Sequence, residues 1–149
     1  MNMDGSRVAD ITSVYDASGF TLLGLIQDNG TGSYIGNVEL SPDGTRAYLL
    51  TVSGSSISEI TVFDTTQRTP GTSYLVKIGS IPLKDQATDI TGQYYSISAP
   101  QSYLMSPLGD TLFLVGDLNF IVVPIPASLA KGEPQPQRLQ TLSRQSRGL

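Results

Sequence analysis

A short phrase that occurs twice most constrains what this chain can fold into. Residues 40–52 read Leu-Ser-Pro-Asp-Gly-Thr before an apolar run, and residues 105–115 read Met-Ser-Pro-Leu-Gly-Asp before another. Each copy predicts a strand, a tight turn and a second strand, because proline fixes φ early in the turn and glycine accepts the positive φ that follows. A unit this small cannot bury its own faces, so its repetition predicts sheets that stack on one another.

Short apolar runs bounded by Gly, Pro, Asp and Ser continue the pattern on both sides of each copy, and they are typical of strands. Around the first copy we expect four strands, over residues 36–41, 45–52, 59–65 and 73–81. Around the second copy we expect strands over residues 102–106, 110–115, 119–125 and 137–142. Helical periodicity is nearly absent, so the sequence predicts an all-β protein made of four-stranded antiparallel meanders.

Residues 13–16 and 20–26 match the third and fourth strands of the first copy, which predicts part of one more unit before it. The expected organisation is a single region. It consists of a half unit (1–35), a full unit (36–81), an insertion (82–100), a second full unit (101–142) and a tail (143–149).

The composition excludes several classes of function. The chain has no histidine and no cysteine, so Ser-His-Asp chemistry, Cys-His chemistry and thiolate metal sites are excluded within it. Its net charge of −4 disfavours binding to a nucleic-acid backbone. No apolar run approaches the roughly 18 residues of a membrane-spanning helix. We therefore expect no cofactor, no metal, no nucleic acid and no membrane span. The compartment stays open, with the periplasm or the extracellular space slightly favoured over the cytoplasm.

Two pairs of aspartates are candidates for function, and each has a plainer interpretation. Asp43 and Asp110 lie in the two repeated turns, where a carboxylate either binds a cation or hydrogen-bonds nearby amides; the turn role is favoured. Asp16 and Asp64 end matching strands, where they either line a common rim or fix the next turn through backbone hydrogen bonds; the turn role is again favoured.

The insertion is the strongest candidate for an interaction site. Long loops on a rigid scaffold often carry function, and this one combines two acids with two aromatic side chains. The candidate residues are Asp85, Asp89, Tyr94 and Tyr95. Their composition suits contact with a carbohydrate or a protein, although tyrosines that cover a sheet edge explain it as well.

The repeat resembles the YVTN/lactonase-like β-propeller superfamily. The matching residues are Ser41-Pro42-Asp43-Gly44, Ala47-Tyr48-Leu49 and Val62-Phe63-Asp64-Thr65, and the resemblance covers roughly residues 8–142. The second copy departs from the pattern, because Leu108 replaces the turn aspartate and Val123-Pro124-Ile125 replaces the Phe-Asp-Thr segment. The resemblance implies an incomplete β-propeller of about two and a half blades.

Three functions follow from an incomplete propeller. The first is a non-enzymatic interaction module, which is a fragment or a subunit of a larger propeller and binds a protein or carbohydrate ligand. The second is a fragment of a propeller enzyme such as a lactonase-like hydrolase. The third is a structural subunit that completes a ring by oligomerising, because unpaired edges and open faces favour association.

Overall fold

The computed structural model describes residues 1, 5–10, 12–26, 33–34, 38–53, 56–83, 102–115 and 120–130. Within these ranges all regular secondary structure is β-strand, and no helix there is long and apolar enough to cross a membrane. The strands are β1 (Arg7–Ala9), β2 (Ser13–Asp16), β3 (Thr21–Leu25), β4 (Ser33–Tyr34), β5 (Glu39–Leu40), β6 (Arg46–Ser53), β7 (Ser56–Arg68), β8 (Leu75–Pro82), β9 (Ser102–Met105), β10 (Thr111–Val115) and β11 (Phe120–Pro124).

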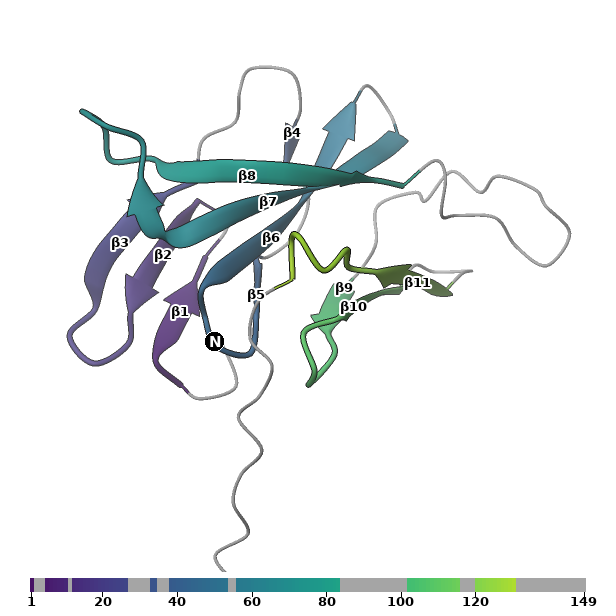
Figure 1. The fold of residues 1–149 in the computed structure, drawn as a ribbon, viewed down its shortest axis with the longest axis horizontal. Helices are drawn as coiled ribbons and strands as arrows, with labels where there is room; N and C mark the ends of the chain where they lie inside the picture. The colour runs from purple at the N-terminus through teal and green to yellow at the C-terminus, as the bar shows by residue number, and fades with distance from the viewer. Residues whose placement is uncertain are drawn as a thin grey trace, which may run out of the picture.

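These strands form three antiparallel sheets that follow one another along the chain. The N-terminal sheet has the order β1-β2-β3, the middle sheet β4-β6-β7-β8 with β5 also on β6, and the C-terminal sheet β9-β10-β11. Figure 1 shows the N-terminal sheet on the left, the middle sheet across the centre and the C-terminal sheet on the right. The expected all-β fold built from antiparallel meanders is therefore confirmed.

The middle sheet contains all four strands expected around the first repeated turn. Its first strand is interrupted, because β4 and β5 pair with the same edge of β6 at Tyr34↔Thr51 and Glu39↔Tyr48. Its third strand, β7, runs from Ser56 to Arg68 and is longer than the segment 59–65 that the sequence indicated. The register of β7 against β8 shifts twice, as at β-bulges, and the two strands stay paired as far as Arg68↔Leu75.

The N-terminal sheet has one strand more than the sequence indicated. β1 precedes β2 and follows Gly5, whose φ of 73° matches the 70° of Gly44 before β6. The sheet thus repeats the second, third and fourth strands of the middle sheet. The predicted strand 137–142 and residues 84–100 of the predicted insertion lie outside the described residues.

The core consists of two apolar layers, one on each side of the middle sheet. Ala47 and Leu49 of β6 belong to the layer shared with the N-terminal sheet, which includes Val14. Tyr48 and Leu50 belong to the layer shared with the C-terminal sheet. Successive residues of β6 point to opposite faces, so one strand supplies both layers, and this explains why its sequence is apolar without alternation.

Close backbone contacts fix the N-terminal sheet to the middle sheet. Gly24 of β3 lies so near Leu75 that a Cβ atom built on it would be 2.3 Å from the Leu75 Cδ2 atom. Arg68 donates hydrogen bonds from Nε to the Leu23 carbonyl (2.6 Å) and from Nη2 to the Leu22 carbonyl (2.7 Å). The amide of Leu25 donates to the Ser73 carbonyl at 2.8 Å. The two sheets are therefore joined by backbone groups as well as by packing.

A turn after β11 fastens the C-terminal sheet to the middle sheet. The Tyr48 hydroxyl donates to the Leu129 carbonyl at 3.1 Å. The Leu129 side chain lies against Gly79, where a Cβ atom would be 2.9 Å from the Leu129 Cδ2 atom. Gly79 pairs with Val62 in the sheet register, so Leu129 packs over the face of the middle sheet that carries Tyr48 and Val62.

Phe20 is the described residue other than glycine that has a positive φ, 50°, and its side chain is 73% exposed. This left-handed backbone costs a bulky residue about 1–2 kcal/mol. We expect Phe20→Gly to raise the free energy of unfolding by about 1 kcal/mol, measured by urea denaturation. Phe20→Ala is the control, because it removes the ring but keeps the unfavourable backbone. An equal gain in both variants would assign the effect to the ring and would contradict the prediction.

Candidate interaction surface

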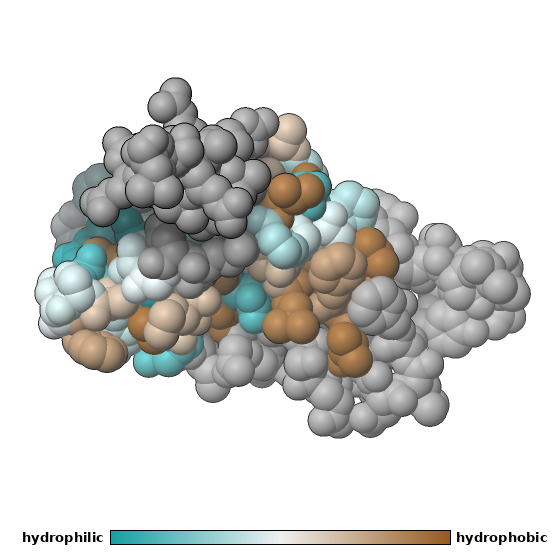
Figure 2. Space-filling model, turned by 90° about the horizontal axis from the view of Figure 1, so that it is seen from below, coloured by the Kyte–Doolittle hydropathy of each residue, from teal (hydrophilic) through white to brown (hydrophobic). Residues whose placement is uncertain are grey.

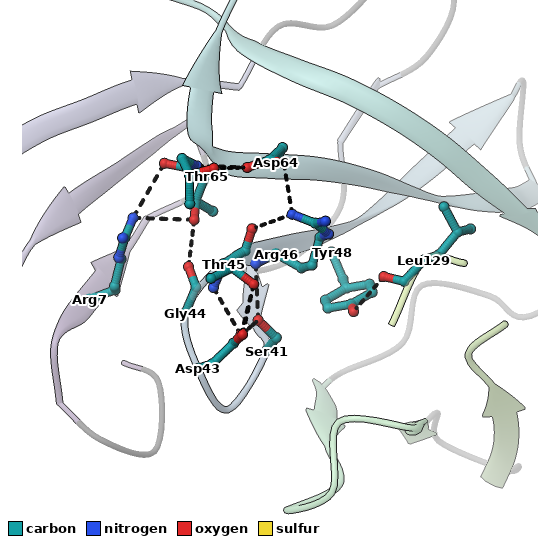
Figure 3. Close-up of polar contacts among 11 residues, drawn as sticks. Arg7, Ser41, Asp43, Gly44, Thr45, Arg46, Tyr48, Asp64, Thr65 and Leu129 are labelled. Atoms are coloured by element: carbon teal, nitrogen blue, oxygen red, sulfur yellow. Dashed lines mark hydrogen bonds and ion pairs between the residues drawn. The ribbon is translucent and has the colours of Figure 1, made fainter. Parts of the chain in front are cut away.

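The first repeated turn uses its aspartate to hold the turn together. The Asp43 carboxylate accepts hydrogen bonds from the Ser41 hydroxyl (2.6 Å), the Thr45 amide (3.0 Å) and the Thr45 hydroxyl (2.9 Å), as Figure 3 shows. Burial alone would raise the pKa of Asp43, but these hydrogen bonds and the charge of Arg46 outweigh it, and the pKa is lowered. The carboxylate oxygens are thus committed to the turn, as the favoured interpretation expected.

An aspartate also holds the second repeated turn together, but it stands at a different position in the turn. Leu108 stands where the first turn has Asp43, and Asp110, two residues later, accepts a hydrogen bond from the Ser106 hydroxyl at 2.8 Å. The Ser106 oxygen in turn accepts from the amides of Asp110 and Thr111. Hydrogen bonds from Ser106 and Thr111 lower the pKa of Asp110. Leu108 is left 61% exposed at the tip of the turn.

Asp16 and Asp64 also fix the turns that follow them. Asp16 accepts from the amide and hydroxyl of Ser18, and Asp64 accepts from the amide of Thr66 (2.8 Å) and its hydroxyl (2.5 Å). Among the residues that the structure describes, no three potential metal ligands come together. The four aspartates are therefore held in the turns by these hydrogen bonds.

Asp64 has a second partner, Arg46, in a buried ion pair that no sequence pattern indicates. Arg46 Nη1 lies 2.8 Å from Asp64 Oδ2, and the two side chains are only 8% and 9% exposed. Burial alone would raise the pKa of Asp64, but the hydrogen bonds from Thr66 and the charge of Arg46 outweigh it, and the pKa is lowered. The pair joins β6 to β7 within the middle sheet.

Arg7 extends this polar cluster to the N-terminal sheet. Its Nη1 atom donates to the Thr65 carbonyl (3.3 Å) and to the Thr65 hydroxyl oxygen (3.2 Å). The Thr65 hydroxyl donates to the Gly44 carbonyl at 2.5 Å. Figure 3 shows the chain of contacts from Arg7 through Thr65 and Gly44 to the first turn. These contacts join the N-terminal sheet to the middle sheet, so the cluster serves the packing of the sheets.

Glu39 lies where the first strands of the middle and C-terminal sheets meet. Burial raises the pKa of its carboxyl, and a hydrogen bond from the Met105 amide opposes that rise. Sequence reasoning missed this residue. Its burial follows from its pairing, because Glu39 lies opposite the fully buried Tyr48 of β6.

The outer face of the C-terminal sheet carries an apolar row that the rest of the described structure leaves partly open. Leu104, Phe113 and Val122 lie side by side across β9, β10 and β11, and we call this row the C-terminal face. Leu104 is 58% exposed and Val122 is 48% exposed. Seen from below, hydrophobic residues gather toward the side of the molecule where these strands lie (Figure 2).

The middle sheet has an equivalent row, and there it is covered. The shared Ser-Pro-x-Gly turn aligns Tyr48 with Phe113. Tyr48 pairs with Glu39 on one side and Val62 on the other, as Phe113 pairs with Leu104 and Val122. Tyr48 and Val62 are fully buried under the C-terminal sheet. The C-terminal face is therefore the surface on which a further sheet would continue the stack.

The residues predicted as an interaction loop, Asp85, Asp89, Tyr94 and Tyr95, lie outside the described residues. Their role stays a prediction.

Comparison with known proteins identifies the fold of the chain but not a protein family within that fold. No family model matches the chain, and no curated protein matches it. Among solved structures, the chain is similar to the crystal structure of the C-terminal WD40 domain of Sif2, with 15% sequence identity and a TM-score of 0.50. The match covers 84% of this chain and 32% of that one, so the chain spans about a third of the length of the structure it matches. The β-propeller fold, with an incomplete set of blades, is thereby confirmed.

Proposed function

We propose that the chain is a non-enzymatic interaction module built from β-propeller blades, and that it binds protein partners through its C-terminal face. The observation that carries the proposal is the difference between two equivalent valines. Val62 of the middle sheet is fully buried, whereas Val122 of the C-terminal sheet is 48% exposed. Contiguous exposed apolar side chains on a sheet face are typical of binding surfaces.

The chemistry of the site favours binding over catalysis. The described aspartates of the rim are held by hydrogen bonds in turns, and the buried ion pair Arg46–Asp64 joins two strands of one sheet. An apolar strand face recognises another apolar sheet by area and shape, and a few central residues carry most of the affinity. In this proposal the module belongs to a larger propeller of the YVTN/lactonase-like type. Its blades follow the divisions 1–35, 36–81 and 101–142, and the insertion 82–100 provides a second contact region.

We expect the double variant Leu104→Asp/Val122→Asp to bind its protein partners about tenfold more weakly or worse, because buried apolar anchors would become charged. The measurement is quantitative affinity capture from a proteome, with each captured protein compared between wild type and variant. Leu108→Asp is the matched control: the side chain is 61% exposed, but it lies in the turn and not in the row.

Two results would contradict the proposal. The first is a set of partners that the double variant and the control retain equally. The second is hydrolysis of lactone substrates above background by the wild-type chain, which would favour the enzyme-fragment alternative.

A further inference from the structure

In each described sheet, the equivalent position of the second strand of the repeat lies on the face that points toward the C-terminal end of the row of sheets. In β1 of the N-terminal sheet, Ala9 packs into the layer shared with the middle sheet. In β6 the equivalent Tyr48 packs into the layer shared with the C-terminal sheet. In β10 the equivalent Phe113 lies on the C-terminal face. The same face-to-face packing of sheets therefore occurs twice within the described structure. The C-terminal face has the residues for a third contact of this kind.

The outer side of the N-terminal sheet has the other type of face, the one that packs against a preceding sheet. Val8, Tyr15 and Leu22 lie in one row across β1, β2 and β3, and we call this row the N-terminal face. Tyr15 points away from the interior, because its neighbour Val14 is fully buried in the layer shared with the middle sheet. All three side chains are half-buried. The N-terminal and C-terminal faces thus belong to the first and last of the three described sheets, whose order along the molecule Figure 1 shows.

We propose that the occupant of the C-terminal face is the N-terminal face of a second copy of this chain, so that two molecules close head to tail into one propeller. The inference rests on the proposed function, since it names the partner of the same face. Its support is continuity: the contact would repeat the packing by which the N-terminal and middle sheets, and the middle and C-terminal sheets, already meet.

The number of described sheets favours two copies. The described residues of one chain form three sheets, so two copies supply six such sheets and three copies supply nine. Closed propellers typically have about 4–8 blades, which two copies satisfy and three exceed. A head-to-tail contact forms a ring when the rotation between copies closes. The ring would also cover Leu104 and Val122 in each copy.

Light scattering coupled to size-exclusion chromatography tests this assembly with the full chain. The expected mass is twice the 15.9 kDa of one chain, falling toward one chain on dilution. Val122→Lys on the C-terminal face and Tyr15→Glu on the N-terminal face should each raise the dimer dissociation constant by about tenfold or more. Leu108→Lys should leave it unchanged, and circular dichroism establishes that each variant is folded.

Mixing the two face variants distinguishes a head-to-tail dimer from other dimers. In a mixture of Val122→Lys and Tyr15→Glu, one contact joins two unaltered faces and the other brings the new lysine and glutamate to the same interface. Dimerisation should therefore recover in the mixture although each variant alone is monomeric. A dimer that Val122→Lys breaks but Tyr15→Glu leaves intact joins two C-terminal faces; this result would overturn the inference and keep the proposed function. A wild-type monomer at all concentrations would overturn the inference alone, since the capture experiment tests the face independently.

Discussion

Replacing Arg46 with methionine is expected to lower the free energy of unfolding by about 3–5 kcal/mol, because the Asp64 carboxylate stays buried without its cation. The two side chains are 8% and 9% exposed, and their charged atoms lie 2.8 Å apart. The measurement is equilibrium urea unfolding followed by circular dichroism. Methionine fills much of the volume of the arginine stem. The decrease in the free energy of unfolding therefore measures the loss of the ion pair and not the creation of a cavity.

The control for this prediction is the second ion pair of the middle sheet. Lys77 and Glu59 lie 3.7 Å apart with side chains 38% and 30% exposed. Lys77→Met should cost no more than about 1 kcal/mol, because water screens an exposed pair. Equal losses at the two positions would show that burial does not set the strength of the Arg46–Asp64 pair.

The effect of Arg46→Met should also depend on pH. The pKa of Asp64 is lowered in the folded state, so its ionised form stabilises the fold above its ordinary pKa of 3.8. That stabilisation is lost as the pH falls below 3.8 and through the lowered pKa. The difference in stability between wild type and variant should therefore shrink in acid and stay constant near neutral pH.

Gly24→Ala is expected to lower the free energy of unfolding by about 1–3 kcal/mol, because the core has no room for a methyl group there. The new Cβ atom would lie 2.3 Å from Leu75 Cδ2 and 2.7 Å from Leu75 Cγ. Leu75 is only 2% exposed, so it has little freedom to move. Thermal and urea unfolding would both report the loss.

Two further variants locate the cause. Gly19→Ala lies in the turn before β3, where the nearest atom to the new Cβ is the Thr21 hydroxyl oxygen at 3.4 Å, and its effect should be close to zero. In a Leu75→Ala background the clash is removed, so Gly24→Ala should cost much less than in the wild type. An undiminished cost in that background would contradict the steric explanation.

The local parts of the fold were predictable from the sequence, because short-range rules determine them. The Ser-Pro-x-Gly phrase predicted both hairpin turns, and Gly44 and Gly109 have the positive φ values that such turns require. The absence of helical periodicity predicted the all-β class. The extra strand β1 was missed because a strand of three residues, Arg7–Ala9, has too little pattern of its own.

The contacts between sheets were not predictable, because they join residues far apart in the chain. Nothing near Gly24 indicates that Leu75 will lie against it, and nothing near Arg68 indicates that it will reach the carbonyls of β3. The C-terminal face was missed for a related reason. The strands of the C-terminal sheet are apolar on both sides, which predicts cover on both sides, and only the arrangement of the three sheets shows which side is left open.

The bond between the Tyr48 hydroxyl and the Leu129 carbonyl bears on the order of events during synthesis. The two groups are 81 residues apart in sequence, whereas β6, β7 and β8 are consecutive and pair with their immediate neighbours. Local pairings form before distant ones, because a shorter loop costs less entropy to close. The middle sheet can therefore form while the ribosome is still extending the chain. The hydrogen bond from Tyr48 can form only after residue 129 has been synthesised, so the attachment of the C-terminal sheet to the middle sheet is a late step.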